Sequence, residues 1–111
     1  MLPFQTIDVR EYLDTNGRSL YAQWFNGLNA QAAAKVAIAV PRLAQGNFSS
    51  VKGVGSGVYE HRIDFGPGYR IYFGKSEDCI VILLGSGTKR RQQADIASAI
   101  DRWRDYKNRA K

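Results

Sequence analysis

The residues best suited to chemistry lie in one stretch, 58–73, on both sides of a Gly66-Pro67-Gly68 turn. Polarity alternates on each side of this turn, which predicts a β-hairpin whose side chains point alternately to its two faces. One face then carries Glu60, Arg62, Asp64, Arg70 and Tyr72. Guanidinium groups beside a carboxylate and a phenol, held on a rigid hairpin, indicate a surface that binds anions.

A second basic cluster, Thr88-Lys89-Arg90-Arg91, follows the apolar strand expected at 79–84 and starts the last expected helix. The N-terminus of a helix presents free backbone N–H groups and a partial positive charge to an anion. Three consecutive cations at that end oppose the helix dipole, so the cluster indicates function at some expense of stability. A solvated turn is the alternative interpretation.

If the two groups of cations converge, the sequence predicts a cationic pocket that needs no metal. Such a pocket suits phosphoryl chemistry on RNA, in which a 2′-hydroxyl attacks the adjacent phosphorus and fixed cations stabilise the charge on the non-bridging oxygens. Glu60 is a candidate base and Lys89 a candidate acid. A surface that binds phosphate without catalysis would use the same residues.

Other site chemistries have little support in the sequence. The chain has one histidine, one cysteine and no carboxylates clustered at ligand spacing, so neither a zinc site nor a nucleophilic triad is expected. The histidine, His61, falls on the other hairpin face with Tyr59 and Ile63. This position favours a structural histidine, and a general base is the alternative.

Length and charge define the class of protein. The 111 residues are enough for one domain. The net charge of +6 is uneven, because residues 1–50 carry four basic and three acidic groups, whereas residues 51–111 carry twelve and seven. A basic half indicates an anionic partner such as nucleic acid or an acidic protein, with a solubilising surface as the alternative. No apolar run is long enough for a bilayer and residues 1–5 lack signal-peptide features, so we expect a cytoplasmic protein without a membrane partner.

The pattern along the chain predicts a compact α+β domain. A short strand is expected at 5–9, and an amphipathic helix follows the candidate N-cap Ser19. A second helix runs from Asn29 to a glycine at position 46, with Pro41 as a candidate kink. Residues 49–57 read as a loop with glycines at alternate positions. The hairpin, the 79–84 strand and a last helix complete the order.

Three segments together resemble one known family. The stretches 57–73, 82–89 and 93–96 are similar to the phage-derived addiction-module killer proteins, which are HigB-type toxins of the RelE/ParE superfamily. The resemblance extends over nearly the whole chain and implies one RelE/ParE-like domain over residues 1–111. It implies two N-terminal helices packed on a small antiparallel sheet, with a C-terminal helix.

The same resemblance implies a function. It is that of the toxin of a type II toxin–antitoxin system, a ribosome-dependent mRNA endoribonuclease that inhibits translation without metal or cofactor. Its partners would be mRNA, the ribosome and a cognate antitoxin, often of the helix-turn-helix type. Residues carried over by position are Arg62, Arg70 and Lys89 as catalytic, and Arg90, Arg91, Tyr72 and Glu60 as contacts to RNA or phosphate.

The resemblance is incomplete at one position. RelE-type nucleases place a tyrosine in the C-terminal helix near the phosphate, where this chain has Ile96. Two alternative functions therefore stay open. One is a ParE-like poison of DNA gyrase, and the other is a catalytically weak domain that binds an antitoxin or serves as a co-repressor.

Overall fold

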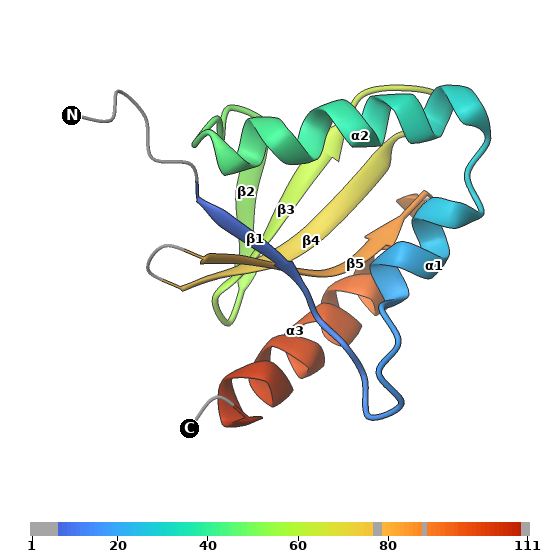
Figure 1. The fold of residues 1–111 in the computed structure, drawn as a ribbon. Helices are drawn as coiled ribbons and strands as arrows, with labels where there is room; N and C mark the ends of the chain where they lie inside the picture. The colour runs from blue at the N-terminus through green and yellow to red at the C-terminus, as the bar shows by residue number, and fades with distance from the viewer. Residues whose placement is uncertain (1–6, 77–78, 88, 110–111) are drawn as a thin grey trace.

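The centre of the molecule is a five-stranded mixed sheet (Figure 1). The computed structural model describes residues 7–76, 79–87 and 89–109. The strands are β1 (Asp8–Glu11), β2 (Val51–Gly55), β3 (Val58–Ile63), β4 (Tyr69–Ser76) and β5 (Cys79–Ser86). They lie in the order β1-β5-β4-β3-β2, with β1 parallel to β5 and every other pair antiparallel.

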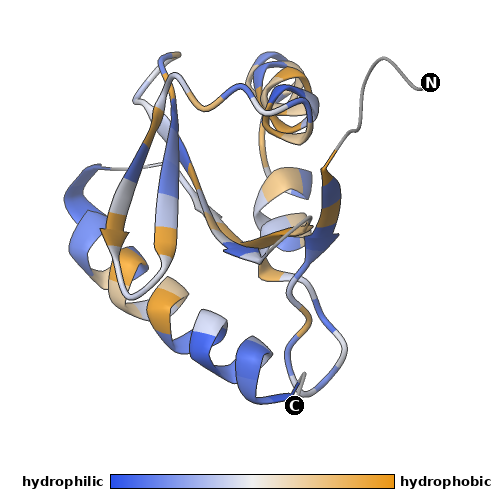
Figure 2. Cartoon of the chain, turned by 90° about the vertical axis from the view of Figure 1, so that its left-hand side faces the viewer, coloured by the Kyte–Doolittle hydropathy of each residue, from blue (hydrophilic) through white to orange (hydrophobic). Residues whose placement is uncertain are grey.

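Helices cover both faces of this sheet (Figure 2). On one face lie α1 (Leu20–Asn26) and α2 (Ala30–Ala44). The other face carries α3 (Gln92–Arg109), which follows a short 3-10 turn, η1 (Lys89–Arg91). The caps of α1 and α2 are those the sequence predicts, because Ser19 and Asn29 each accept a hydrogen bond from the backbone N–H three residues on.

The predicted layout of two N-terminal helices on a small antiparallel sheet is wrong. The sheet has five strands and is mixed, and the layout implied by the resemblance omits β1, which precedes both helices. β1 lies at the sheet edge beside β5, so that Asp8 pairs with Cys79 and Glu11 with Ile82. Residues 5 and 6 of the strand expected at 5–9 lie outside the described residues. A parallel pair between such distant segments leaves no local signal in the sequence, since it needs no hairpin turn.

The loop expected at 49–57 is also wrong, because most of it forms β2. This strand pairs with β3 and places Lys52 opposite Glu60. Ser56 and Gly57, with φ of 55° and 81°, make the tight turn between the two strands. Two consecutive residues at positive φ are typical of the turns that suit a twisted hairpin. The alternate glycines hid the strand, because glycine lacks a side chain that would show alternation.

Several local predictions are confirmed. The hairpin β3–β4 turns through Gly66 and Gly68, both at positive φ. The helix expected from Asn29 is α2, which is followed by Gly46 at φ 84°. The interruption expected at Pro41 does not occur, because α2 continues through it to Ala44. The apolar segment from Cys79 is an interior strand with helices over both faces.

Each face of the sheet holds a tryptophan against a glycine. Trp24 of α1 lies over Gly85 of β5, and Trp103 of α3 lies over Gly74 of β4. A Cβ atom at Gly85 would be 2.1 Å from the indole of Trp24, and one at Gly74 would be 2.3 Å from that of Trp103. The helices can therefore approach the sheet this closely only where the strand has no side chain.

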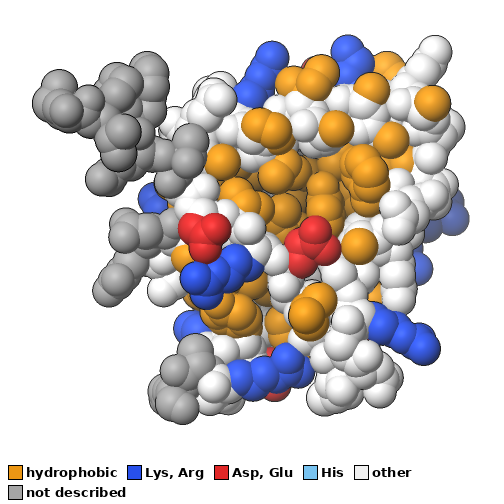
Figure 3. Space-filling model, in the orientation of Figure 1, with side chains coloured by type: hydrophobic (Ala, Val, Ile, Leu, Met, Phe, Trp, Pro, Cys, Tyr) orange, Lys and Arg blue, Asp and Glu red, His pale blue; other side chains and the backbone are white. Residues whose placement is uncertain are grey.

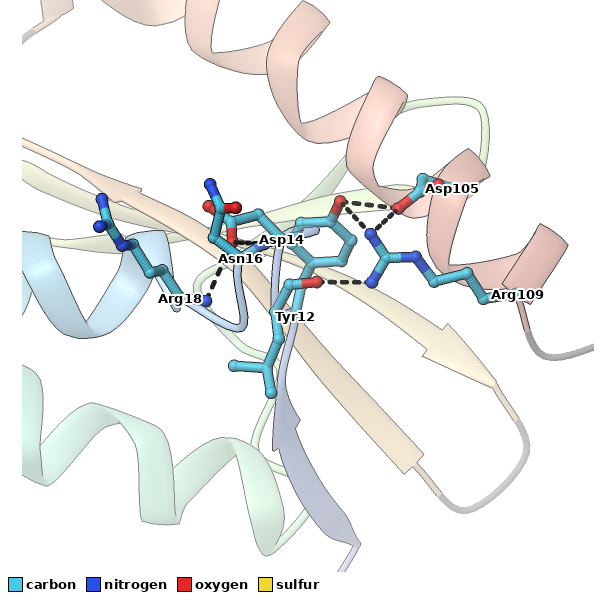
Figure 4. Close-up of polar contacts among 7 residues, drawn as sticks. Tyr12, Asp14, Asn16, Arg18, Asp105 and Arg109 are labelled. Atoms are coloured by element: carbon cyan, nitrogen blue, oxygen red, sulfur yellow. Dashed lines mark hydrogen bonds and ion pairs between the residues drawn. The ribbon is translucent and has the colours of Figure 1, made fainter.

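The end of α3 is fastened to the segment after β1 (Figure 4). The Tyr12 hydroxyl donates a hydrogen bond to Asp105 Oδ2 at 2.7 Å. Arg109 pairs with the same carboxylate at 2.6 Å and donates to the carbonyl of Leu13 at 2.6 Å. These contacts complement the packing of Trp103 and fix the direction in which α3 crosses the sheet.

The opposite layer covers its face less completely. Figure 3 shows apolar side chains gathered between α2 and α1, beside β1. The partly buried members of this cluster include Ile7, Val9, Trp24, Phe25, Leu28 and Val40.

None of the described helices is long and apolar enough to cross a membrane.

Candidate functional site

Four of the predicted site residues share the face of β3 and β4 that α3 covers. In the hairpin register Glu60 lies opposite Tyr72, and Arg62 lies opposite Arg70. Tyr72 packs in the same cluster as Ala99 and Trp103 of α3, which identifies the face. The grouping that the alternation predicts is therefore confirmed as geometry.

Glu60 is the centre of this group. Its side chain is only 2% exposed, and its Oε1 lies 3.7 Å from both Arg70 Nε and Lys52 Nζ. Its Oε2 accepts a hydrogen bond of 2.9 Å from Gln92 Nε2. A buried carboxylate needs partners of this kind, because isolated burial of a charge is costly.

The contact with Gln92 also positions the second basic cluster. Gln92 is the first residue of α3 and directly follows the turn Lys89–Arg91. Its hydrogen bond to Glu60 joins that end of α3 to β3. The three cations of η1 are thus held at the end of the sheet face that carries Arg62 and Arg70. Thr88 of the predicted cluster lies outside the described residues.

Burial divides the predicted residues into two sets. Glu60, Arg70 and Tyr72 are buried, with Arg70 at 6% exposure. The exposed set consists of Arg62, Lys89, Arg90 and Arg91. A ligand arriving from solvent contacts the exposed cations, whereas the buried residues stabilise the strands that carry these cations. We therefore interpret Arg70 and Tyr72 as positioning residues, in contrast to the direct contacts expected from the sequence.

Below Glu60 the buried polar network continues toward α3. The hydroxyl of Tyr72 and Oδ2 of Asp95 are both buried and have no hydrogen-bond partner among the described residues. Burial raises the pKa of Tyr72, and the negative charge of Glu60 raises it further. The phenol is therefore neutral at physiological pH.

Three members of this network were not predicted: Lys52, Gln92 and Asp95. Lys52 lies opposite Glu60 only once β2 is recognised as a strand. Asp95 did leave a signal, because it occupies the same helical stripe as Ala99 and Trp103, where the other members are apolar. An acidic residue on a buried stripe is a reason to look for a polar partner.

A shallow hollow of about 400 Å³ opens beside Glu60, and Lys52, Glu60, Arg62 and Asp64 contribute to its lining. Two cations and two carboxylates there could hold a phosphate and exchange a proton with its ester oxygens. Among the described residues, no three His, Cys, Asp or Glu side chains come together as metal ligands would.

Comparison with known proteins identifies one relative. The chain is 41% identical over 80 residues to an uncharacterized protein of Haemophilus influenzae, and the alignment covers 71% of this chain and 81% of that protein. The chain belongs to the family of this Haemophilus protein. No established family profile matches it.

The histidine lies on the opposite face of the sheet, as predicted, and away from this site. His61 is 9% exposed and packs on the side of α2. Burial lowers the pKa of its imidazole, and the charge of Arg42 lowers it further, so the ring is neutral at physiological pH. His61 and Glu60 are neighbours in β3, so their side chains lie on opposite faces of the sheet, and His61 is not a direct partner of a ligand held beside Glu60.

Proposed function

We propose that the protein is the toxin of a type II toxin–antitoxin system and cleaves mRNA on the ribosome in the cytoplasm. The observation that carries this proposal is the hydrogen bond from Gln92 to Glu60, which holds the η1 cations against the face of Arg62. Lys52 and Arg62 line the hollow beside Glu60, and the exposed cations of η1 directly precede Gln92. Together these cations suit the phosphates of a single RNA strand. The resemblance to HigB-type toxins supplies the class of substrate and the helix-turn-helix antitoxin as partner.

The proposed reaction is an internal transfer at one phosphodiester. The 2′-oxygen forms a bond to phosphorus, its proton passes to Glu60, and the bond to the 5′-oxygen breaks. That oxygen takes a proton from Lys89, which leaves a 2′,3′-cyclic phosphate. Arg62 and the η1 arginines stabilise the negative charge of the transition state, and Arg70 keeps Glu60 in place. Removing one such cation should slow cleavage about 10²–10³-fold.

Induction in growing cells tests the proposal. We expect growth arrest from the wild type, with new 5′ ends inside translated codons by primer extension. Arg62→Ala should lose both, because Arg62 is exposed and lines the hollow. Arg18→Ala, which removes an exposed arginine in the segment before α1, should retain both. Arg70→Ala is a poorer test, because it leaves buried Glu60 without its guanidinium.

Other outcomes would redirect the proposal. Arrest without cleavage, with relaxed DNA accumulating, would contradict the nuclease and favour a ParE-like gyrase poison. Wild-type protein that is folded and harmless would contradict an active toxin altogether.

A second candidate is a domain that binds RNA or an antitoxin with little catalysis. The burial of Glu60, Arg70 and Tyr72 favours it, because groups this covered have restricted access to a substrate. Binding of a short RNA by purified protein, without the appearance of cyclic phosphate ends on ribosomes, would support this second candidate.

A further inference from the structure

A second polar hollow lies on the other face of the sheet, between α2 and β3. It has a volume of about 250 Å³ and is lined in part by Lys35 and Arg42 of α2 and by His61, Arg62 and Asp64 on the β3 side. Pockets for larger organic ligands typically measure about 300–1,000 Å³, so this hollow suits a small polar group.

The imidazole of His61 is an unusual part of this lining. The side chain is more than nine-tenths buried, and its Nδ1 has no hydrogen-bond partner in the part of the chain that the structure describes. Buried ring nitrogens normally have one. A neutral imidazole donates a hydrogen bond from one ring nitrogen and accepts one at the other, and only the donating nitrogen can bind an anion.

The charges of the hollow favour an anion. Lys35, Arg42 and Arg62 contribute three cations against the one carboxylate of Asp64. Across the described part of the chain, Arg42 makes no ion pair, so its guanidinium is available to a ligand. The hydroxyl of Ser50 adds a further donor. A phosphate group accepts hydrogen bonds from all of these groups.

We propose that this hollow is a second phosphate-binding site, with Arg42 and His61 as its principal contacts. It joins the hollow beside Glu60, because Ser50, Arg62 and Asp64 line both. The junction lies where β3 extends past the beginning of β2, at the hydrogen bond of 3.1 Å from Arg62 N to the Ser50 carbonyl. A polar path therefore passes around the sheet edge from one face to the other.

This path suggests the source of the phosphate. If the proposed function holds, the second site takes a backbone phosphate from the same RNA strand whose scissile phosphate lies beside Glu60. The binding of a phosphate group itself does not depend on the protein being a nuclease, so the two proposals can fail separately.

The chain's single histidine makes the first test direct. The imidazole signals of His61 are followed by NMR while inorganic phosphate is added at constant pH and ionic strength. We expect a saturable shift, and Arg42→Gln should weaken the affinity about tenfold or more. Arg18→Gln, the matched control, should leave it unchanged. The backbone spectrum of Arg42→Gln shows whether the fold is kept.

The second test distinguishes the two sources. A short 2′-O-methyl RNA, which cannot be cleaved by the proposed reaction, replaces phosphate in the titration. We expect it to shift His61 as well. The triple variant Lys89→Ala, Arg90→Ala and Arg91→Ala, which removes the η1 cations, should weaken the shift of His61 on adding RNA. The shift on adding inorganic phosphate should stay unchanged, because none of the three residues lines the second hollow.

Two results would overturn the inference. A shift that does not saturate, or one equally strong in Arg42→Gln, would show that the hollow is not a phosphate site. A normal phosphate response with no response to RNA would contradict the path around the edge and indicate a free phosphate or a small phosphorylated molecule. Neither result depends on toxicity, whose loss would instead contradict the proposed function.

Discussion

At the scale of single residues, Glu60 has the largest structural role at the candidate site. Its carboxylate contacts Arg70 and Lys52 and accepts a hydrogen bond from Gln92. One buried charge on β3 therefore links that strand to β4, β2 and α3. Arg70 is itself buried, with Nη1 lacking a partner. The positions of Arg70 and Gln92 therefore depend on the charge of Glu60.

A double-mutant cycle tests this dependence. Glu60→Leu leaves Arg70 as a buried unpaired cation and should lower the free energy of unfolding by about 3 kcal/mol. Adding Arg70→Met removes that cation and should recover most of the loss, since an apolar pair of similar volume is often neutral. Urea unfolding of Glu60→Leu, Arg70→Met and the double variant measures both steps. Equal losses in the single and double variants would show that Arg70 does not need Glu60.

Tyr21 predicts a pH dependence of stability. Burial raises its pKa to about 12, and the charge of Glu11 contributes to the rise. An unfolded tyrosine titrates near pH 10, so the unfolded chain loses this proton first. The stabilisation is complete below pH 10 and is lost as the pH rises from about 10 toward 12.

Tyr21→Phe removes this titrating group and should flatten the curve. Between pH 10 and 11, the unfolding free energy of the wild type should fall by about 1 kcal/mol more than that of the variant. Urea unfolding at intervals of pH measures the difference, and the two curves should run parallel from pH 7 to 9. Parallel curves above pH 10 as well would contradict the raised pKa.

At the scale of elements, the sequence was informative where side chains alternate or follow a helical stripe. The hairpin β3–β4 was predicted with the two faces of each strand, because glycines mark its turn and polarity alternates on both sides. β2 was missed because Gly53 and Gly55 conceal its alternation. The pairing of β1 with β5 was missed because a parallel pair between distant segments depends on tertiary packing alone.

The candidate site follows the same division. The face shared by Glu60, Arg62, Arg70 and Tyr72 could be read from a period of two. The sequence did not show which of these residues are buried, because α3 covers that face from a distant part of the chain. Lys52 of β2 and Gln92 of α3 contact Glu60. The local sequence pattern does not predict that β2 and α3 pack beside β3.

The close approach of helix to sheet gives a prediction about two glycines. Gly74→Ala and Gly85→Ala should each lower the unfolding free energy by about 1–3 kcal/mol, because the new methyl overlaps an indole ring that packing holds in place. Thermal unfolding followed by tryptophan fluorescence reports on both sites.

Gly53→Ala is the matched control for these variants. Gly53 also lies in a strand, but a methyl there meets no atom within 4 Å, so its effect should stay within about 0.5 kcal/mol. An equally large loss in Gly53→Ala would show that strand glycines matter for a reason other than the tryptophans.

At the scale of the whole molecule, positively charged side chains lie on both faces of the sheet at the edge formed by β2 and the end of β3. Lys52 and Arg62 line the hollow beside Glu60, and Lys35 and Arg42 line the hollow beneath α2. The exposed cations Lys89–Arg91 directly precede Gln92, which donates a hydrogen bond to Glu60. Arg62 and Asp64 line both hollows. A strand bound along this edge would contact cations that are far apart in sequence, so its affinity should depend on their placement more than on the net charge of +6.

Salt dependence separates placement from total charge. For single strands, the logarithm of the binding constant falls with the logarithm of salt concentration by about 0.7 for each phosphate neutralised. Arg62 and the three η1 cations should therefore give a slope of about −3 with a short 2′-O-methyl RNA, more negative if the second hollow also binds the strand. Replacing Lys89, Arg90 and Arg91 by alanine should reduce the slope by about 2.

The control removes the same number of positive charges elsewhere, through Arg10→Ala, Arg18→Ala and Arg104→Ala. Arg10 and Arg104 already pair with Asp8 and Asp101, and none of the three belongs to η1 or lines either hollow. Fluorescence anisotropy at several salt concentrations should give this variant a slope close to that of the wild type. If both variants lowered the slope equally, binding would follow net charge, and the proposed RNA path around the sheet edge would be wrong. A selective loss in the η1 variant would instead place the RNA at the start of α3, whether or not the bound strand is then cleaved.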